Sequence, residues 1–153
     1  MMARVSGVIL RRYVQFGVDR LIATVPALLV LVLGLHFALR TPPGDGRMVL
    51  KYAVLVLFIL VLLAVNWFIE VWVPHRWLGG TPGMRCLGLQ VITEHGETPE
   101  LRHYMIRWLM VIVDGYFFGL VGALAIAFSS RNQRFGDMVA RTLVVRRGAQ
   151  PTR

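Results

Sequence analysis

Three long apolar segments dominate the sequence and limit what it can fold into. Residues 21–39 form 19 consecutive residues without a charge, and residues 52–69 form another 18. The third segment, residues 104–130, is interrupted only by the charged residues Arg107 and Asp114. A helix of roughly 20 apolar residues crosses the ~30 Å hydrocarbon core of a bilayer. The sequence therefore predicts an integral membrane protein.

Two long transmembrane helices are expected from the first two segments. The first runs from about residue 12 to 39, with a kink at Pro26. The second runs from about residue 48 to 73 and is stopped by Pro74.

The distribution of positive charge suggests how the chain is oriented. The net charge is +9, and the N-terminus, the middle stretch 75–98 and the tail 131–153 all carry arginine. Basic segments favour the cytoplasmic side. All three lie there only if the third apolar segment forms two helices, at about 99–114 and 115–130. Each would be ~24 Å long, which suits a short or re-entrant hairpin. The alternative is one long third span with the tail outside.

Two polar segments have the character of short strands. The sequence G-L-Q-V-I-T-E-H-G-E alternates in part and precedes a turn, and R-T-L-V-V-R-R is the second candidate. They can pair only if both lie on one side of the membrane. Between them, Thr98 as N-cap and Pro99 at the first position predict a helix start. We therefore expect one all-α membrane domain over residues 1–153, with two long helices, a shorter helical hairpin (three or four spans) and a small cytoplasmic strand-like patch.

Charged and polar groups inside the apolar segments need an explanation. Asp19 and Arg20 could lie at the headgroups, where they cost little. At mid-bilayer each charge costs ~2.5–3.5 kcal/mol on insertion scales. Arg20 can extend to the headgroups, whereas other polar groups fall in the same half of the membrane as Asp19. The candidate ion or proton site comprises Asp19, Asn66, Glu70, Arg107 and Asp114, with Asn66 and Glu70 on one helix face.

Two interpretations of this site stay open. The groups could form a structural polar network that holds short helices together. They could instead line a cytoplasm-facing cavity that binds a cation, a proton or a small polar solute.

Several motifs resemble the RDD family of small bacterial membrane proteins. They are R-R-Y-V-Q-F-G-V-D-R-L-I in the first helix, T-P-G-x-R-x-L-G-L-x-V after the second, and Q-x-x-x-D-x-x-A-x-T-x-V-V near the end. The likeness covers about residues 9 to 146. The second of these motifs, here called the cytoplasmic motif, comprises Thr81, Pro82, Gly83, Arg85 and Gly88. Met84 stands where the family usually has lysine.

The resemblance implies three family-motif residues, one arginine and two aspartates. Arg12 matches the arginine, with Arg11 as the alternative by a slip of one residue. Asp19 matches the first aspartate. Asp137 matches the second, with Asp114 as the alternative. From its position after Gly136, Asp137 could also cap a short helical turn.

The family resemblance implies a role in transport, with cation–proton exchange suggested for some members. We expect a transporter or transport-associated protein of the bacterial inner membrane, multi-pass, with a cytoplasmic N-terminus. Asp19 and Glu70 are the candidate carriers. The alternative is a non-transporting accessory or scaffold subunit of a larger membrane complex.

Other function classes are not favoured by the sequence. We expect no enzyme activity, cofactor, metal site or nucleic-acid partner, because no nucleophile–base pair, metal-ligand spacing or RNA-binding signature is found. The expected partners are the lipid bilayer and either a homo-oligomer or a larger complex. Cys86, the single cysteine, is expected to be buried.

Overall fold

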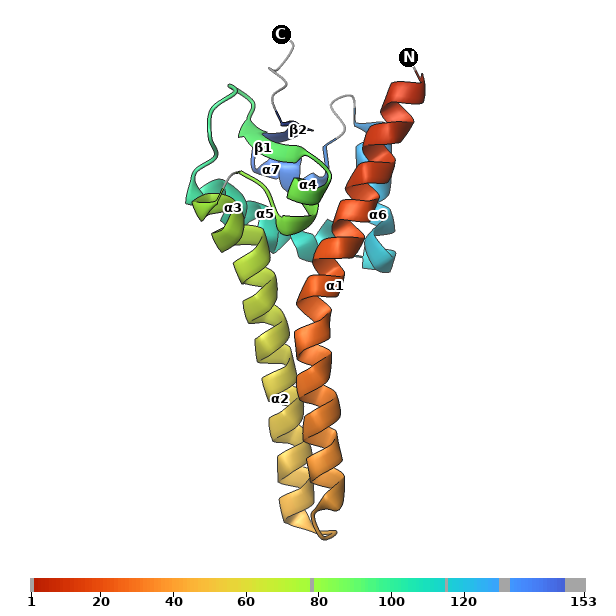
Figure 1. The fold of residues 1–153 in the computed structure, drawn as a ribbon, viewed down its shortest axis with the longest axis vertical. Helices are drawn as coiled ribbons and strands as arrows, with labels where there is room; N and C mark the ends of the chain where they lie inside the picture. Colours follow the sequence, from red (N-terminus) through yellow and green to blue (C-terminus); the bar gives the residue numbers. More distant parts are fainter. Residues whose placement is uncertain (1, 78, 115, 130–132, 148–153) are drawn as a thin grey trace. The chain divides into compact units, whose positions relative to one another are not determined.

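The fold is mostly helical and includes one two-stranded sheet (Figure 1). The computed structural model describes residues 2–77, 79–114, 116–129 and 133–147, with side chains for 10–77, 79–112, 121–122, 124–129 and 133–147. The chain divides into two compact units. Unit 1 comprises Met1–Asp19 and Phe68–Arg153, and unit 2 comprises Arg20–Trp67.

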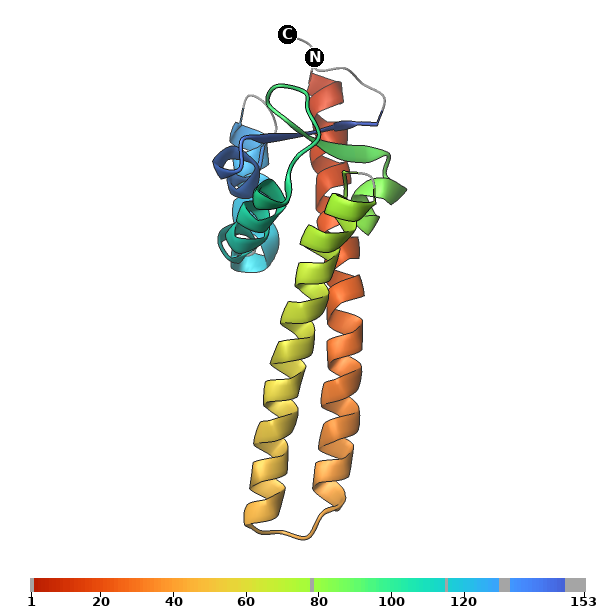
Figure 2. The same ribbon diagram turned by 90° about the vertical axis from the view of Figure 1, so that its left-hand side faces the viewer.

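Unit 2 consists of two helices that run side by side (Figure 2). They are the C-terminal part of α1 (Met2–Arg40) and α2 (Asp45–Trp67). Gly34 allows them to approach closely, since a Cβ atom there would lie only 2.6 Å from Cγ1 of Val54. At the link between the helices, the Nε of Arg47 donates a hydrogen bond to the carbonyl oxygen of Thr41 at 2.8 Å.

Two helical stretches, Leu10–Arg40 and Asp45–Arg76, are long and apolar enough to cross a membrane, judged by length and composition. Most of their large apolar side chains are not covered by protein. Leu21 is 65% exposed and Val49 is 67% exposed. A core helix of a soluble protein would bury such side chains. The two predicted long apolar helices are therefore confirmed as elements that could span a bilayer.

The ends of these helices differ from the prediction. Helix α1 begins at Met2 and continues through Pro26. After α2 the chain forms a π-helical segment, η1 (Phe68–Trp72), and then α3 (Val73–Arg76). The prediction that Pro74 ends the helix is wrong. Pro74 lies in the first turn of α3, where a missing backbone N–H carries no penalty.

Unit 1 contains the shorter elements of the fold. The sheet consists of β1 (Leu89–Thr93) and β2 (Thr142–Arg146), which pair antiparallel with Val91 opposite Val144. Both predicted strands and their pairing are therefore confirmed. The remaining helices are α4 (Pro82–Cys86), α5 (Leu101–Asp114), α6 (Tyr116–Phe128) and α7 (Phe135–Val139).

The third apolar segment forms two helices, α5 and α6, which contact each other. Their bounds lie within two residues of the expected ones, except that Gly115 falls outside the described residues. The number of membrane crossings stays a prediction.

Two local expectations are wrong. Thr98 does not cap α5, which begins at Leu101. Instead, the backbone N–H of Glu100 donates to Nδ1 of His103 at 3.1 Å, so a histidine side chain satisfies a backbone donor at the helix start. Cys86 is exposed, because it lies at the surface end of the short helix α4 and not in the packed core.

Replacing Gly34 with alanine should weaken the packing of α1 against α2, because the new methyl group would overlap the rigid Val54 side chain. We expect Gly34→Ala to lower the thermal unfolding midpoint in detergent. Gly17→Ala is the matched control. A Cβ at Gly17 meets nothing within 4 Å, and alanine gains about 1 kcal/mol of helix propensity. An unchanged midpoint for Gly34→Ala would contradict the close approach.

Candidate functional site: a buried charge network

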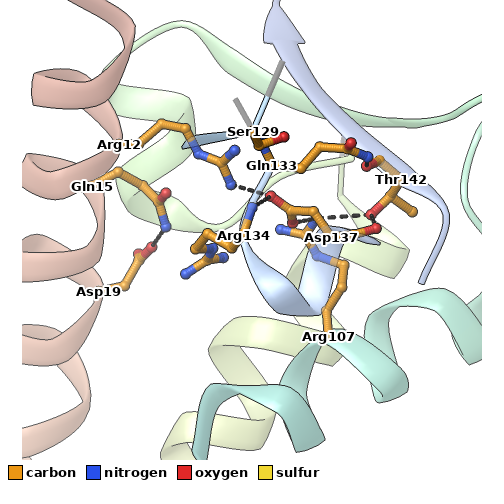
Figure 3. A network of polar contacts seen from close by, with 9 residues as sticks. All are labelled: Arg12, Gln15, Asp19, Arg107, Ser129, Gln133, Arg134, Asp137 and Thr142. Carbon is orange, nitrogen blue, oxygen red and sulfur yellow. Dashed lines mark hydrogen bonds and ion pairs between the residues drawn. The ribbon is translucent and has the colours of Figure 1, made fainter. Parts of the chain in front are cut away.

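Asp19 lies on α1 in unit 1 and is fully buried. Its carboxylate accepts three hydrogen bonds. Gln15 Nε2, one turn earlier on α1, donates to Oδ2 at 2.7 Å (Figure 3). Thr81 Oγ1 donates to the same oxygen at 2.6 Å, and the backbone N–H of Gly83 donates to Oδ1 at 2.8 Å. Both carboxylate oxygens are therefore engaged, as a buried acid requires.

The T-P-G part of the cytoplasmic motif has a specific geometry for this contact. Thr81 is the N-cap of α4, and its hydroxyl oxygen accepts from the backbone N–H of Met84 at 3.2 Å. Pro82 occupies the first turn, where proline is favoured. At Gly83 a Cβ would lie 2.8 Å from the backbone oxygen of Gln15 and 2.9 Å from Oδ1 of Asp19. Glycine is thus required for α4 to reach α1.

Asp137 is the centre of a second set of contacts. It lies on α7 and is fully buried. Arg12 of α1 donates to Oδ2 and Arg107 of α5 donates to Oδ1, each as a buried ion pair (Figure 3). The backbone N–H of Arg134 also donates to Oδ2, at 3.0 Å. One carboxylate thereby joins α1, α5 and α7, and it also caps α7, as the sequence suggested.

The charge of Asp137 is fixed by its neighbours. Burial alone would raise the pKa of this carboxyl, but Arg107, Arg12 and Arg134 hold the pKa well below its ordinary range. Because the folded-state pKa is depressed, the ion pairs contribute stability at neutral pH. That stability is lost only as the pH falls below about 3.9, the ordinary value for aspartate. The surrounding arginines therefore favour the ionised form of Asp137.

Neutral polar groups complete the surroundings of Asp137 (Figure 3). Arg107 Nη1 also donates to Oγ1 of Thr142 at 3.1 Å. Gln133 Nε2 donates to the carbonyl oxygen of Thr142 at 2.9 Å. The start of β2 is thus tied to the same network, which connects the sheet to the helices.

Glu70 supplies a second buried acid near Asp19. It is 2% exposed, lies in the π-helical segment η1, and acts electrostatically on Asp19. Among the described side chains of unit 1, the buried charged groups are three arginines and three acids: Arg12, Arg107, Arg134, Asp19, Glu70 and Asp137. Their formal charges cancel, which is the condition for burying charge at tolerable cost.

Members of the predicted five-residue site have different partners in the structure. Glu70 acts electrostatically on Asp19, whereas Arg107 pairs with Asp137. That the five residues form one ion or proton site stays a prediction. Asn66 accepts a hydrogen bond from Arg20 within unit 2, so Arg20 is not simply a headgroup anchor. The π-helical segment η1 begins at Phe68, between Asn66 and Glu70. The side chain of Asp114 lies outside the described side chains.

The remaining motif residues are also placed. Arg12 is buried, whereas Arg11 is exposed, so only Arg12 takes part in the network. Met84 is fully buried. Three members that sequence reasoning missed are Gln133, Arg134 and Thr142. The only sequence signal for Arg134 is its spacing of three before Asp137, which fits a helix-capping pair.

Comparison with known families shows the family of the chain. The model of the RDD family matches residues 7–141, which include all six buried charges. The chain belongs to the RDD family. It is similar to the uncharacterized protein YxaI of Bacillus subtilis (strain 168), with 25% identity over 142 residues that cover 88% of this chain and 93% of that protein. No solved structure matches the chain.

Removing the charge of Asp137 should be strongly destabilising. Asp137→Asn leaves Arg12 and Arg107 buried without their anion, and breaking one partner of a buried pair costs about 3–5 kcal/mol. We expect a large loss of unfolding free energy, measured by denaturant titration in detergent. Glu100→Gln is the matched control, because its ion pair with Arg102 is exposed and should cost under about 1 kcal/mol. Equal effects of the two substitutions would contradict the network.

Proposed function

We propose that this RDD-family membrane protein takes part in transport, exchanging a proton for a small cation at the Asp19–Glu70 pair. The observation that supports this proposal is the burial of both acids, each in a helical stretch apolar enough to cross a bilayer. An ionisable group inside a membrane helix is costly and marks an ion or proton path more often than it serves packing alone.

The proposed exchange uses the mutual repulsion of the two acids. Two carboxylates that share a buried site bind one proton between them more readily than either would alone. When that proton leaves to the cytoplasmic side, a monovalent cation takes its place and the charge of the site is unchanged. Since Asp19 is held by Thr81 and Gly83, access requires the 81–83 segment to withdraw from α1.

The proposed setting is the bacterial inner membrane, with the N-terminus in the cytoplasm. Hydrogen bonding between β1 and β2 supports a tail on the same side as the middle stretch, since a backbone ladder cannot form across a bilayer. Positive charge in both segments favours the cytoplasmic side.

Asp19→Asn should abolish cation-driven proton flux in proteoliposomes. The amide has nearly the same shape as the carboxylate, but it cannot bind and release a proton. Flux is measured with a pH-sensitive dye trapped inside the vesicles, under an imposed gradient of Na⁺ or K⁺. Glu97→Gln, which removes a carboxylate from an exposed turn, is the control and should retain full flux. Undiminished flux in a folded Asp19→Asn protein would rule out the carrier role.

A second candidate function is an accessory subunit that does not transport. The observation that favours it is the saturation of Asp19 and Asp137, whose carboxylate oxygens are all engaged in contacts within the chain. Acids used in this way hold helices together.

Mild-detergent purification of the tagged full chain separates the two functions. An accessory subunit should copurify with a membrane partner in fixed stoichiometry. Recovery of the chain alone, together with flux in proteoliposomes, would exclude the accessory role.

A further inference from the structure

Part of the cytoplasmic motif is not used by the Asp19 contacts. Thr81 and Gly83 hold Asp19, but Arg85 is exposed and points to no partner among the described residues. Gly88 is also exposed, and a Cβ there would meet nothing within 4 Å. The segment from Arg85 to Leu89 therefore presents a surface whose role is unassigned.

Four exposed arginines border this segment. Arg11 Nη1 of α1 donates to the carbonyl oxygen of Leu87 at 3.3 Å. The backbone N–H of Arg147 donates to the carbonyl oxygen of Gly88 at 2.8 Å. Arg146 is the strand partner of Leu89. We call Arg11, Arg85, Arg146 and Arg147 the arginine patch. All of its members belong to unit 1.

The charge of the arginine patch is not balanced within the described chain. None of its members forms an ion pair there. Among the described side chains of unit 1, the exposed acids are Glu94, Glu97 and Glu100, beyond the opposite end of β1. From Leu89 to Glu94 an extended strand covers roughly 17 Å, which exceeds the screening length of about 8 Å at physiological salt. The patch therefore favours an external anion.

The apolar neighbours of Arg11 indicate where that anion is found. Leu10 is 65% exposed, Tyr13 is 51% exposed and Val14 is 44% exposed, all on α1 within three residues of Arg11. A guanidinium beside exposed apolar and aromatic side chains suits the boundary between acyl chains and headgroups. A soluble phosphate ion would make no favourable contact with the apolar part of this surface.

We propose that the arginine patch binds the phosphate of an anionic phospholipid headgroup. Clusters of four or more basic residues beside a membrane helix attract acidic lipids, and arginine binds phosphate oxygens in a bidentate manner. The patch lies outside the buried charge network, so this lipid site is independent of the proposed exchange at Asp19.

Cys86 provides a reporter inside the patch. It is the only cysteine of the chain, it is exposed, and it is adjacent to Arg85. The full chain in dodecyl maltoside is labelled at Cys86 with an environment-sensitive fluorophore and titrated with phosphatidylglycerol. We expect a saturable emission change with phosphatidylglycerol and none with phosphatidylcholine or inorganic phosphate.

Two double substitutions with the same loss of charge test the assignment. Arg85→Gln/Arg146→Gln should raise the half-saturating phosphatidylglycerol concentration about tenfold, because two phosphate contacts are lost. Arg40→Gln/Arg102→Gln, at exposed positions outside the patch, should leave it unchanged. Arg146→Gln/Arg147→Gln, which spares the Asp19 motif, provides a second patch variant if the first does not fold.

Several results would overturn the proposal. Equal half-saturating concentrations for the patch and control variants would remove the patch as the site. An emission change of equal size with inorganic phosphate would identify a site for soluble phosphate. A response to a short RNA but not to phosphatidylglycerol would identify a nucleic-acid surface.

Discussion

The carboxylate of Asp137 between Arg12 and Arg107 is the interaction on which unit 1 depends. These three side chains come from α7, α1 and α5, and Arg12 and Asp137 are 125 residues apart in the chain. Each group is almost completely buried, so none can recover its hydration if the others are removed. The cost of an unpaired buried charge is what makes the arrangement specific. Apolar packing alone would tolerate α7 in several positions.

Helix α1 carries two sets of buried polar contacts on one face, one at Arg12 and one at Asp19. Arg12, Gln15 and Asp19 follow one another at spacings of three and four, which places them on the same side of a helix. The α7 segment binds at Arg12, and the 81–83 segment binds one to two turns further along, at Asp19. The family motifs are far apart in the sequence because each holds a different part of unit 1 to the same helix face.

Periodic features of the sequence predicted the elements well, and pairwise contacts poorly. The lengths of the apolar segments predicted α1 and α2, because a bilayer imposes a simple requirement of length. The positions of the arginines predicted the division between α5 and α6. Alternation revealed both strands. The partner of Arg107 could not be predicted, since Asp137 lies 30 residues away in the sequence. The two nearest acids, Glu100 and Asp114, are not its partners among the described contacts.

The end of the second long helix was predicted wrongly for a definite physical reason. Proline lacks a backbone N–H, so Pro74 was expected to stop the helix. The chain instead forms a π-helical segment from Phe68 to Trp72 and places Pro74 in the first turn of α3, where that N–H is not needed. The shared face expected for Asn66 and Glu70 stays a prediction.

The two contacts on α1 differ in a way that bears on function. Separating Asp137 from Arg12 and Arg107 would leave buried charges without their partners, at a cost of about 3–5 kcal/mol. That cost is a large part of the stability of a small domain. The Asp19 contacts come from neutral donors, Thr81 and Gly83, each worth about 1.5–3 kcal/mol net while the carboxylate is ionised. Protonation of Asp19 would reduce each to about 1 kcal/mol, since its carboxylate is the acceptor. If α1 separates from any part of unit 1 during a working cycle, it is the 81–83 segment that moves while the Asp137 contacts stay closed.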